Sequence, residues 1–306
     1  MRNLFVCILY ILMTVEFFLG NFANIFIALV NFIDWVKRQK LSSADRILTA
    51  LTISRIALLW VTFMFLYSSM LNTTSYNVQV RIIFNITGVV CNHFSTWFAT
   101  LLSIFYLLKI ANFHNFIFLH LKKNINLVIS VVLLGSSVFL FYYLAVMSVE
   151  EIMWVNECER NVTQKTNLTG ILHLSNMAVL TMLNLTPFTT SLLCFLLLIC
   201  SQSKHVRKMQ LHGKGPQDLS TKAHIRALQL IFSFLLLFSI YTVSIIASVW
   251  RFNELQNKPL LFLWQVCALI YPSSHSFLLI WGNKKLTQTF LSMLRQVKRK
   301  WNPLTL

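Results

Sequence analysis

The sequence predicts an all-α integral membrane protein, a seven-transmembrane helix bundle with a short C-terminal amphipathic helix. Three observations support this fold class. The 306 residues are 57% hydrophobic and only 11% charged, whereas a soluble domain is about one quarter charged. The mean hydropathy is +0.67. Long stretches of the chain also contain no charge, so the bilayer is a better solvent for them than water.

Seven segments are long enough to cross a membrane, since a hydrocarbon core of ~30 Å takes roughly 20 helical residues. The first contains one charge, Glu16, the second contains one, Arg55, and the interiors of the other five contain none. We expect these spans at about 3–33, 47–71, 82–109, 125–148, 173–201, 227–250 and 260–283. The first is too long for a signal peptide and lacks a small-residue cleavage site, so we interpret it as an uncleaved helix. The short loops predict a single seven-transmembrane domain over residues 1–306.

Basic residues are distributed unevenly between the two faces of the predicted bundle. One face holds 19 Lys and Arg residues and the other holds 6. Those on the first face lie in the segments 37–46, 109–123, 204–226 and 284–300. The positive-inside bias makes this face cytoplasmic, which predicts an extracellular N-terminus and a cytoplasmic C-terminus.

Two glycosylation acceptors agree with this orientation. Asn161 and Asn167 each begin an Asn-x-Thr tripeptide in the second predicted outer loop. We expect Asn161 to be the modified residue. Asn184 also begins such a tripeptide, but it lies within an apolar span, where we expect no modification.

The residues that follow the last span predict an amphipathic helix over 284–301. Its apolar residues recur at helical spacing and are surrounded by Lys and Arg: Leu286, Phe290, Met293, Leu294, Val297 and Trp301. Such a helix suits the surface of an anionic inner leaflet, so we expect membrane lipids among the partners of the protein.

Polar residues inside the predicted spans form two layers. Asn24, Arg55 and His275 each lie roughly 12–13 Å from the inner end of their span, at ~1.5 Å per residue. Arg55 always carries charge and needs acceptors, for which Asn24, backbone carbonyls or Ser274 are candidates. Glu16 is the obvious counter-ion, but the same spacing places it roughly 25 Å from the inner end, so a direct contact is not expected. This layer is either a structural link between helices or a conformational switch.

The second layer lies nearer the predicted outer face, roughly 21–27 Å from the inner ends. Its members are Asn92, His93, Asn184, Tyr241 and Gln265. Four spans thus place hydrogen-bonding groups at one level among Phe, Leu and Ile side chains. A small-molecule pocket between helices has this composition, mostly apolar with a few polar points. The alternative is that some of these groups face lipid headgroups or one another.

The sequence argues against several classes of protein. It has no Gly-rich phosphate loop and no His or Cys spacing typical of a metal site, so we expect no enzyme and no cofactor. Too few charges are present to cover a soluble nucleic-acid-binding domain. Spans three to seven have no charge in their interiors, which argues against an ion channel. A carrier of neutral solutes and a seven-helix receptor of another class stay open as alternatives.

Several motifs distinguish the chain from the common rhodopsin-like receptors. Span three ends with Phe105-Tyr-Leu-Leu-Lys109 rather than Asp-Arg-Tyr, and span seven contains Tyr271-Pro-Ser-Ser-His275 rather than Asn-Pro-x-x-Tyr. Further motifs are Gly20-Asn-Phe-Ala-Asn24, Leu51-Thr-Ile-Ser-Arg55, Asn92-His-Phe-Ser95 and Pro187-Phe-Thr. Running from span one to the tail, this set resembles the bitter taste receptor (type 2 taste receptor) family of G-protein-coupled receptors.

The resemblance implies a plasma-membrane receptor for bitter small-molecule agonists that activates a gustducin-type heterotrimeric G protein. The pocket positions it implies are Val89, Asn92, His93, Asn184, Tyr241, Ile245 and Gln265. It also associates Asn24, Arg55 and His275 with activation. Gly88 stands where many relatives have Trp, and Gln265 where some carry an acid. We therefore expect a preference for neutral agonists over protonated alkaloids.

Overall fold

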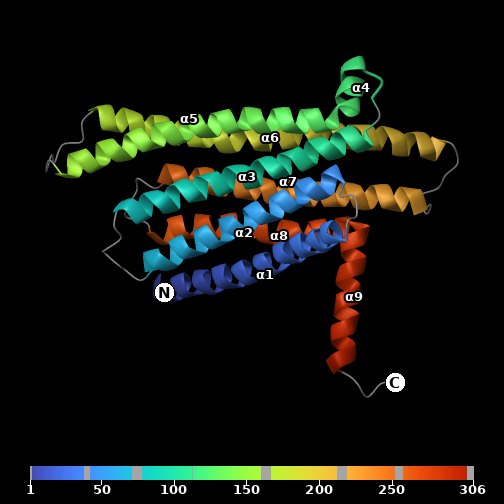
Figure 1. The fold of residues 1–306 in the computed structure, drawn as a ribbon, viewed down its shortest axis with the longest axis horizontal. Coiled ribbons are helices and arrows are strands. Elements are labelled where there is room, and N and C mark those ends of the chain that lie inside the picture. Colours follow the sequence, from blue (N-terminus) through green and yellow to red (C-terminus); the bar gives the residue numbers. More distant parts are fainter. Residues whose placement is uncertain are drawn as a thin grey trace.

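The computed structural model describes residues 2–37, 42–70, 78–111, 113–159, 167–211, 219–251 and 258–301. Within these ranges the regular structure is helical, with no β-strand (Figure 1). The helices are α1 (Arg2–Val36), α2 (Ser43–Met70), α3 (Val78–Ile110), α4 (Phe116–Lys123), α5 (Ile125–Glu159), α6 (Asn167–Leu211), α7 (Leu219–Arg251), α8 (Lys258–Gly282) and α9 (Lys284–Trp301). Seven of them are long and apolar enough to cross a membrane, which confirms the predicted fold class.

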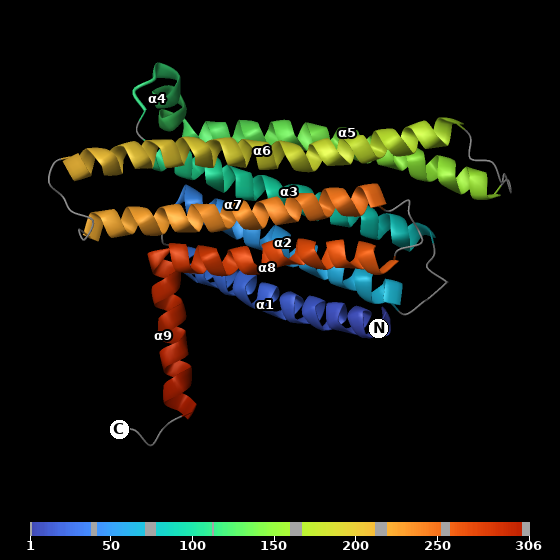
Figure 2. The ribbon, with the colours of Figure 1, turned by 180° about the vertical axis from the view of Figure 1, so that it is seen from behind.

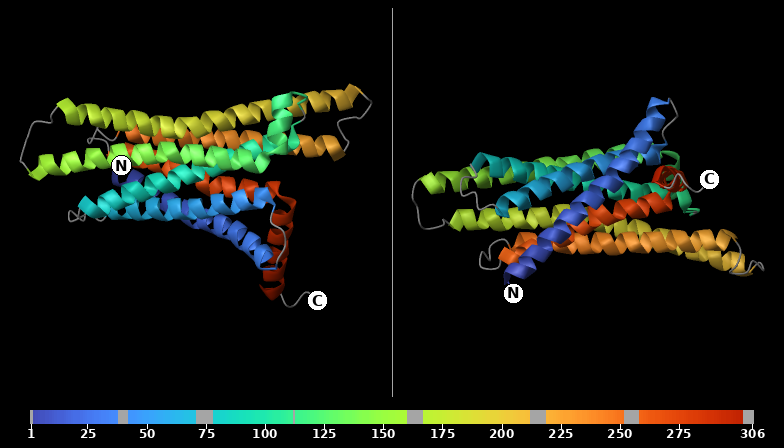
Figure 3. Two further views of the ribbon diagram at one scale, coloured as in Figure 1. Left: turned by 45° about the horizontal axis from the view of Figure 1, so that its top comes forward. Right: turned by 90° about the horizontal axis from the view of Figure 1, so that it is seen from below.

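The seven long helices lie side by side as one bundle, while α4 and α9 stand at one end of it (Figures 1 and 2). We call this the α9 end, and the N-terminus lies at the opposite end. Helix α9 leaves the bundle at a steep angle to α8. Figure 3 shows that α1 crosses its neighbours obliquely rather than running parallel to them.

Helices α3 and α8 form the centre of the bundle. Helix α3 packs against α2, α5 and α6, and α8 packs against α1, α2 and α7. Accordingly, 67% of the apolar window of α3 and 56% of that of α8 are buried, compared with 17% for α5. The exposed apolar side chains of α5, such as Leu134 and Phe141, suit contact with lipid. Functional polar groups on α3 and α8 are therefore held inside the protein.

Two prolines lie inside long helices, α6 and α8, and each is close to a polar contact with a neighbouring helix. Pro187 lies within α6, and its carbonyl accepts a hydrogen bond from Thr100 Oγ1 on α3 at 3.0 Å. Pro272 lies within α8, and its carbonyl accepts from Asn24 Nδ2 on α1 at 3.1 Å. Polar side chains of neighbouring helices thus bond the backbone at the two prolines and link α3 to α6 and α1 to α8.

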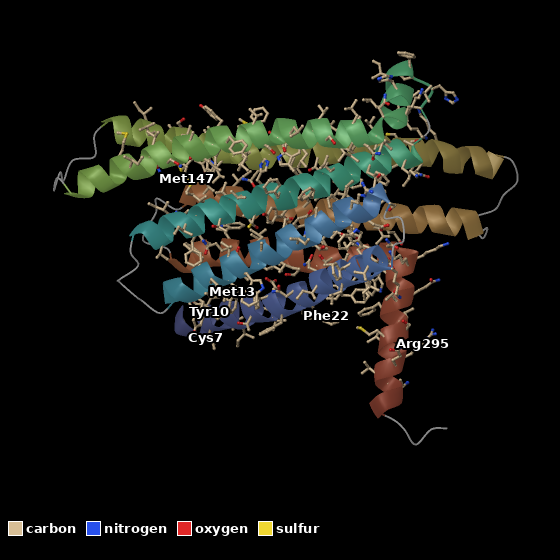
Figure 4. All side chains as sticks on the ribbon, viewed as in Figure 1. Cys7, Tyr10, Met13, Phe22, Met147 and Arg295 are labelled. Atoms are coloured by element: carbon tan, nitrogen blue, oxygen red, sulfur yellow. The ribbon has the colours of Figure 1, made fainter. Side chains whose placement is uncertain are left out.

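The junction between α1 and α9 fixes the position of the amphipathic helix. Leu286 is fully buried, and Lys285 forms an ion pair with Asp34 of α1. Phe290 packs edge-on against Phe26, with ring centroids 5.4 Å apart, and also contacts Phe22. Figure 4 shows Phe22 on α1 beside the start of α9, and Arg295 further along α9 and away from the bundle.

Candidate ligand and activation site

Arg55 lies at the centre of a hydrogen-bonded network that joins α1, α2 and α8. The residue is fully buried. Its Nη2 donates to His275 Nδ1 at 2.6 Å, and its Nη1 donates to Ser276 Oγ at 3.2 Å. Ser276 Oγ in turn donates to Asn24 Oδ1 at 2.8 Å. Because a guanidinium only donates, His275 Nδ1 is the acceptor, and the neutral ring carries its proton on Nε2.

The aromatic ring of Tyr271 lies against this network. The Arg55 guanidinium sits 4.7 Å from the centroid of the Tyr271 ring. The His275 ring stacks on the same ring at 5.3 Å and meets Phe234 of α7 edge-on at 4.5 Å. In the described residues Arg55 has no carboxylate partner, so the ring face and neutral acceptors compensate its charge.

The second polar cluster joins α3, α6 and α7 further from the α9 end. Asn92 Nδ2 donates to Asn184 Oδ1 at 2.8 Å, and the Tyr241 hydroxyl donates to Asn92 Oδ1. Asn184 Nδ2 donates to the Leu180 carbonyl at 2.8 Å. All three cluster side chains are buried. The cluster carries no charge and its members satisfy one another.

The four other candidate pocket residues make no hydrogen bond with this cluster. His93 is buried, but its ring contacts Phe94 and Trp97, and neither ring nitrogen has a hydrogen-bond partner among the described residues. Its direction follows from helical geometry, since adjacent residues point about 100° apart. Val89 packs against the apolar contact between α5 and α6, and Ile245 against the main core. Gln265 is half-buried and makes no hydrogen bond with the described side chains.

Tyr271 also connects the two polar groups. The Tyr241 ring lies 5.1 Å from the Tyr271 ring, and Phe238 stacks on Tyr271 at 5.1 Å. A continuous series of contacts therefore runs from Asn92 through Tyr241 and Tyr271 to Arg55 and His275. Sequence reasoning missed this link, because a Tyr in an apolar span carries no signal of which neighbours its ring contacts.

A cavity of about 200 Å³ lies beyond this network toward the α9 end. Helices α3, α6, α7 and α8 line it, with His275 at its inner limit and Gly282 near its mouth. Tyr106, Leu198 and Leu230 form much of its apolar wall. His275 thus faces both the Arg55 network and a cavity that opens at the end of the bundle.

One expectation about the Arg55 layer is wrong. The hydroxyl partner is Ser276 rather than Ser274, because the inward face of α8 includes His275 and Ser276 while Ser274 borders its outer surface. Glu16 and Arg55 make no contact among the described residues, as expected. Arg55 donates to His275 and Ser276, and the Glu16 backbone carbonyl accepts from Ser273 Oγ at 3.0 Å.

Of the two glycosylation candidates, only Asn167 lies within the described residues. Asn161 lies outside the described residues. Asn167 begins α6 at the end of the bundle opposite α9. The expectation that either residue is modified stays a prediction.

The bundle and its two polar groups define the class of the protein. The structure resembles the crystal structure of squid rhodopsin with a TM-score of 0.58 at 13% identity, over 97% of this chain and 87% of that one. This likeness shows the fold. The protein is thus an all-α membrane protein whose seven-helix bundle has the fold of rhodopsin.

Sequence comparison identifies the family. The family model described as taste receptor protein (TAS2R) matches residues 1–298. Putative taste receptor type 2 member 33 of Homo sapiens is 57% identical over 288 residues, 94% of this chain and 93% of that protein. Taste receptor type 2 member 19 of Pan paniscus is 56% identical over 95% of this chain and 98% of its own.

The chain therefore belongs to the taste receptor type 2 family. It is a multi-pass plasma-membrane G-protein-coupled receptor of the bitter taste family, and not an enzyme. This finding removes the neutral-solute carrier and the receptor of another class as alternatives.

Proposed function

We propose that bitter agonists bind beside the Asn92–Asn184–Tyr241 cluster and that the receptor then activates a gustducin-type heterotrimeric G protein. The single observation that supports this most is the series of contacts through Tyr271. It joins a buried neutral cluster between α3, α6 and α7 to the charged Arg55 network. A ligand that perturbs the first group acts on the second through direct contact.

The cluster suits agonist recognition because its hydrogen bonds are exchangeable. Asn92 and Asn184 each have an amide donor and an acceptor, which an agonist with hydroxyl or carbonyl groups can bond in place of the partner amide. Val89, Ile245 and Gln265 supply surrounding apolar surface and one further amide. His93 supplies two unpartnered ring nitrogens. No acid is present at these positions, which favours neutral ligands.

The Arg55 network suits a switch between two receptor states. An agonist that releases the Tyr241 hydroxyl from Asn92 frees the ring that packs on Tyr271. Tyr271 in turn supports the Arg55 guanidinium and the His275 ring. The agonist thereby shifts an equilibrium between states, to the extent that it binds one of them better.

The cavity at the α9 end is the proposed entry for the G protein. It is lined by α3, α6, α7 and α8 and reaches the ends of α3 and α8, where the basic segments 109–123 and 284–300 begin. Positive charge around an apolar cavity suits an acidic or amphipathic partner segment. This arrangement supports an α9 end that faces the cytoplasm and an N-terminus that faces outward.

Two further assignments follow from that orientation. Helix α9 runs outward from the end of the bundle at a steep angle to α8, and its Lys and Arg residues contact anionic lipids of the inner leaflet. Asn161 and Asn167 lie on the outer side, where either acceptor is open to glycosylation.

The proposal is tested in cells that express the full-length receptor with a chimeric G protein carrying the gustducin tail. A panel of bitter compounds is screened for agonist-dependent calcium release, with the parent cells as control. We expect at least one compound to act only in cells with the receptor. Replacing the gustducin tail with that of a stimulatory G protein should abolish the response. An equal response with both tails contradicts gustducin-type coupling.

A further inference from the structure

A second cavity lies on the outside of the bundle, over α8 and between α1 and α7. Its volume is about 420 Å³, which is within the range of small-molecule sites. Leu19 of α1, Leu236 of α7 and Trp281 of α8 form its edges and are 50%, 54% and 70% exposed. The cavity is therefore a groove that opens toward lipid, and we call it the α8 groove. It shares no lining residue with the proposed agonist site.

Glu16 is the one charged residue that lines the α8 groove, and it lacks a counter-ion in the described part of the chain. Its Oε2 is buried without a hydrogen-bond partner there. Ser273 lies next to it, but the Ser273 hydroxyl donates to the Glu16 backbone carbonyl rather than to the carboxyl group. The Ser233 hydroxyl likewise donates within its own helix, to the Gln229 carbonyl. The groove thus holds an acceptor that the described side chains leave unused.

A carboxylate beside hydrocarbon is costly unless a cation pairs with it. Arg55 lies on the inner side of α8, where Nη1 donates to Ser276 and Nη2 to His275, and its Nε has no hydrogen-bond partner among the described residues. Of the two lysines that follow α8, Lys285 pairs with Asp34 and Lys284 is exposed. The partner of Glu16 is therefore expected from outside the chain. The groove determines the chemistry of this partner, which should carry one positively charged N–H group attached to an apolar body.

We propose that the α8 groove binds hydrophobic amines that reach it through the bilayer. The protonated amine donates to the Glu16 carboxylate, and the apolar body of the ligand lies along Leu236, Phe277 and Trp281. A sterol or other neutral lipid fits the apolar wall but offers no charge to Glu16. The uncharged cluster at Asn92 and the acidic groove thus select different compounds.

The position of the groove gives an amine a route to the receptor's equilibrium. An occupant contacts α1, α7 and α8 at once, beside the Ser273–Glu16 bond that joins α1 to α8. Ser273 and His275 are two residues apart on α8. Holding these three helices together changes receptor activity only insofar as the amine prefers one state. The groove is thus a second ligand site that is reached from the membrane, and a ligand can act there while the agonist site is empty.

The test uses photolabelling of the purified full-length receptor in phosphatidylcholine nanodiscs. The probe is a benzophenone that carries a dimethylaminobutyl chain. Its matched control replaces the dimethylamino group with isopropyl, which keeps the shape and removes the charge. Labelled residues are mapped by peptide mass spectrometry. We expect half-maximal groove labelling by the amine at a concentration at least about tenfold lower than by the control, from one desolvated charge-assisted hydrogen bond.

Three variants sharpen the test. Glu16→Gln should make the two probes label equally. Leu236→Trp should fill the groove and suppress labelling by both, whereas Leu193→Trp on the lipid face of α6 should not. If Glu16→Gln fails to fold, judged by its thermal midpoint, the two Trp variants and the two probes still decide the question.

Several outcomes overturn the proposal. Equal labelling of the wild type by both probes indicates a general lipid groove. If Leu236→Trp leaves labelling by the amine unchanged, the amine binds elsewhere. A receptor that migrates as a dimer and is protected from both probes indicates that a second copy covers the groove. The readout is binding, so failure of gustducin coupling leaves the proposal intact, and loss of groove labelling leaves the proposed function intact.

Discussion

The two polar groups in the core of this receptor are built from different chemistry. The Asn92–Asn184–Tyr241 cluster is neutral, and its members satisfy one another. The Arg55 network contains a permanent charge that neutral acceptors and one ring compensate. Losing one neutral hydrogen bond costs about 1 kcal/mol net, whereas disrupting the surroundings of a buried charge costs several. We therefore expect the Arg55 network to hold the helices and the neutral cluster to be adjustable.

The largest effect is expected from Arg55→Ala. It leaves a cavity the size of a large side chain and removes the partner of His275 and Ser276, so we expect a loss of at least about 3 kcal/mol of stability. Surface labelling of an N-terminal epitope and agonist-induced calcium release measure the result. Normal surface level together with normal signalling would make the network dispensable.

A pair of glycine substitutions compares the packing next to the two groups. A Cβ on Gly20 would lie 2.6 Å from Ser273 Oγ and 2.9 Å from Leu59, whereas a Cβ on Gly88 meets only Val61 at 3.7 Å. Gly20→Ala should therefore cost about 1–3 kcal/mol, and Gly88→Ala should be tolerated. Thermal unfolding of the purified receptor measures both. Equal midpoints would mean that α1 and α8 separate without cost.

Much of the arrangement of the two polar groups can be predicted from the sequence. The length of each charge-free segment, and the depth of a residue along its helix, can be counted directly. The spacing of Asn24, Arg55 and His275 places them in one layer, and they do share one network. Helix rotation is not visible. His93 shares the depth of Asn92, but its ring contacts Phe94 and Trp97 rather than the neutral cluster, which the sequence cannot show. Ser276 was missed for the same reason.

Helix tilt and ring stacking are equally hidden in the sequence. The bond between the Ser273 hydroxyl and the Glu16 carbonyl depends on how α1 crosses α8, which a count of residues from the end of the span cannot show. In the sequence, nothing distinguishes Tyr271 from the apolar residues around it, yet its ring contacts Tyr241, Arg55 and His275. Both properties depend on tertiary packing.

The neutral cluster should respond to substitution in potency rather than in folding. Asn92→Ala removes the bonds to Asn184 and Tyr241, and Tyr241→Phe removes only the second. We expect agonist EC50 to rise about tenfold for Asn92→Ala and about threefold for Tyr241→Phe, with near-normal surface expression. Thr186→Val, on the exposed face of α6, is the control. An unchanged dose–response curve for several agonists would exclude Asn92 from the site.

The smallest effect tests the charge of the agonist site itself. Gln265→Glu adds an acid to a half-buried position that carries none, so protonated amine agonists should gain potency by about two- to fivefold, as expected for a partly solvated ion pair. Neutral agonists should be unchanged or slightly weaker. Dose–response curves for a cationic agonist and a neutral one, measured in the same cells, provide the comparison. If cationic alkaloids are already the most potent agonists of the wild type, the uncharged cluster does not set ligand preference, and the acidic α8 groove becomes the place to look for their binding.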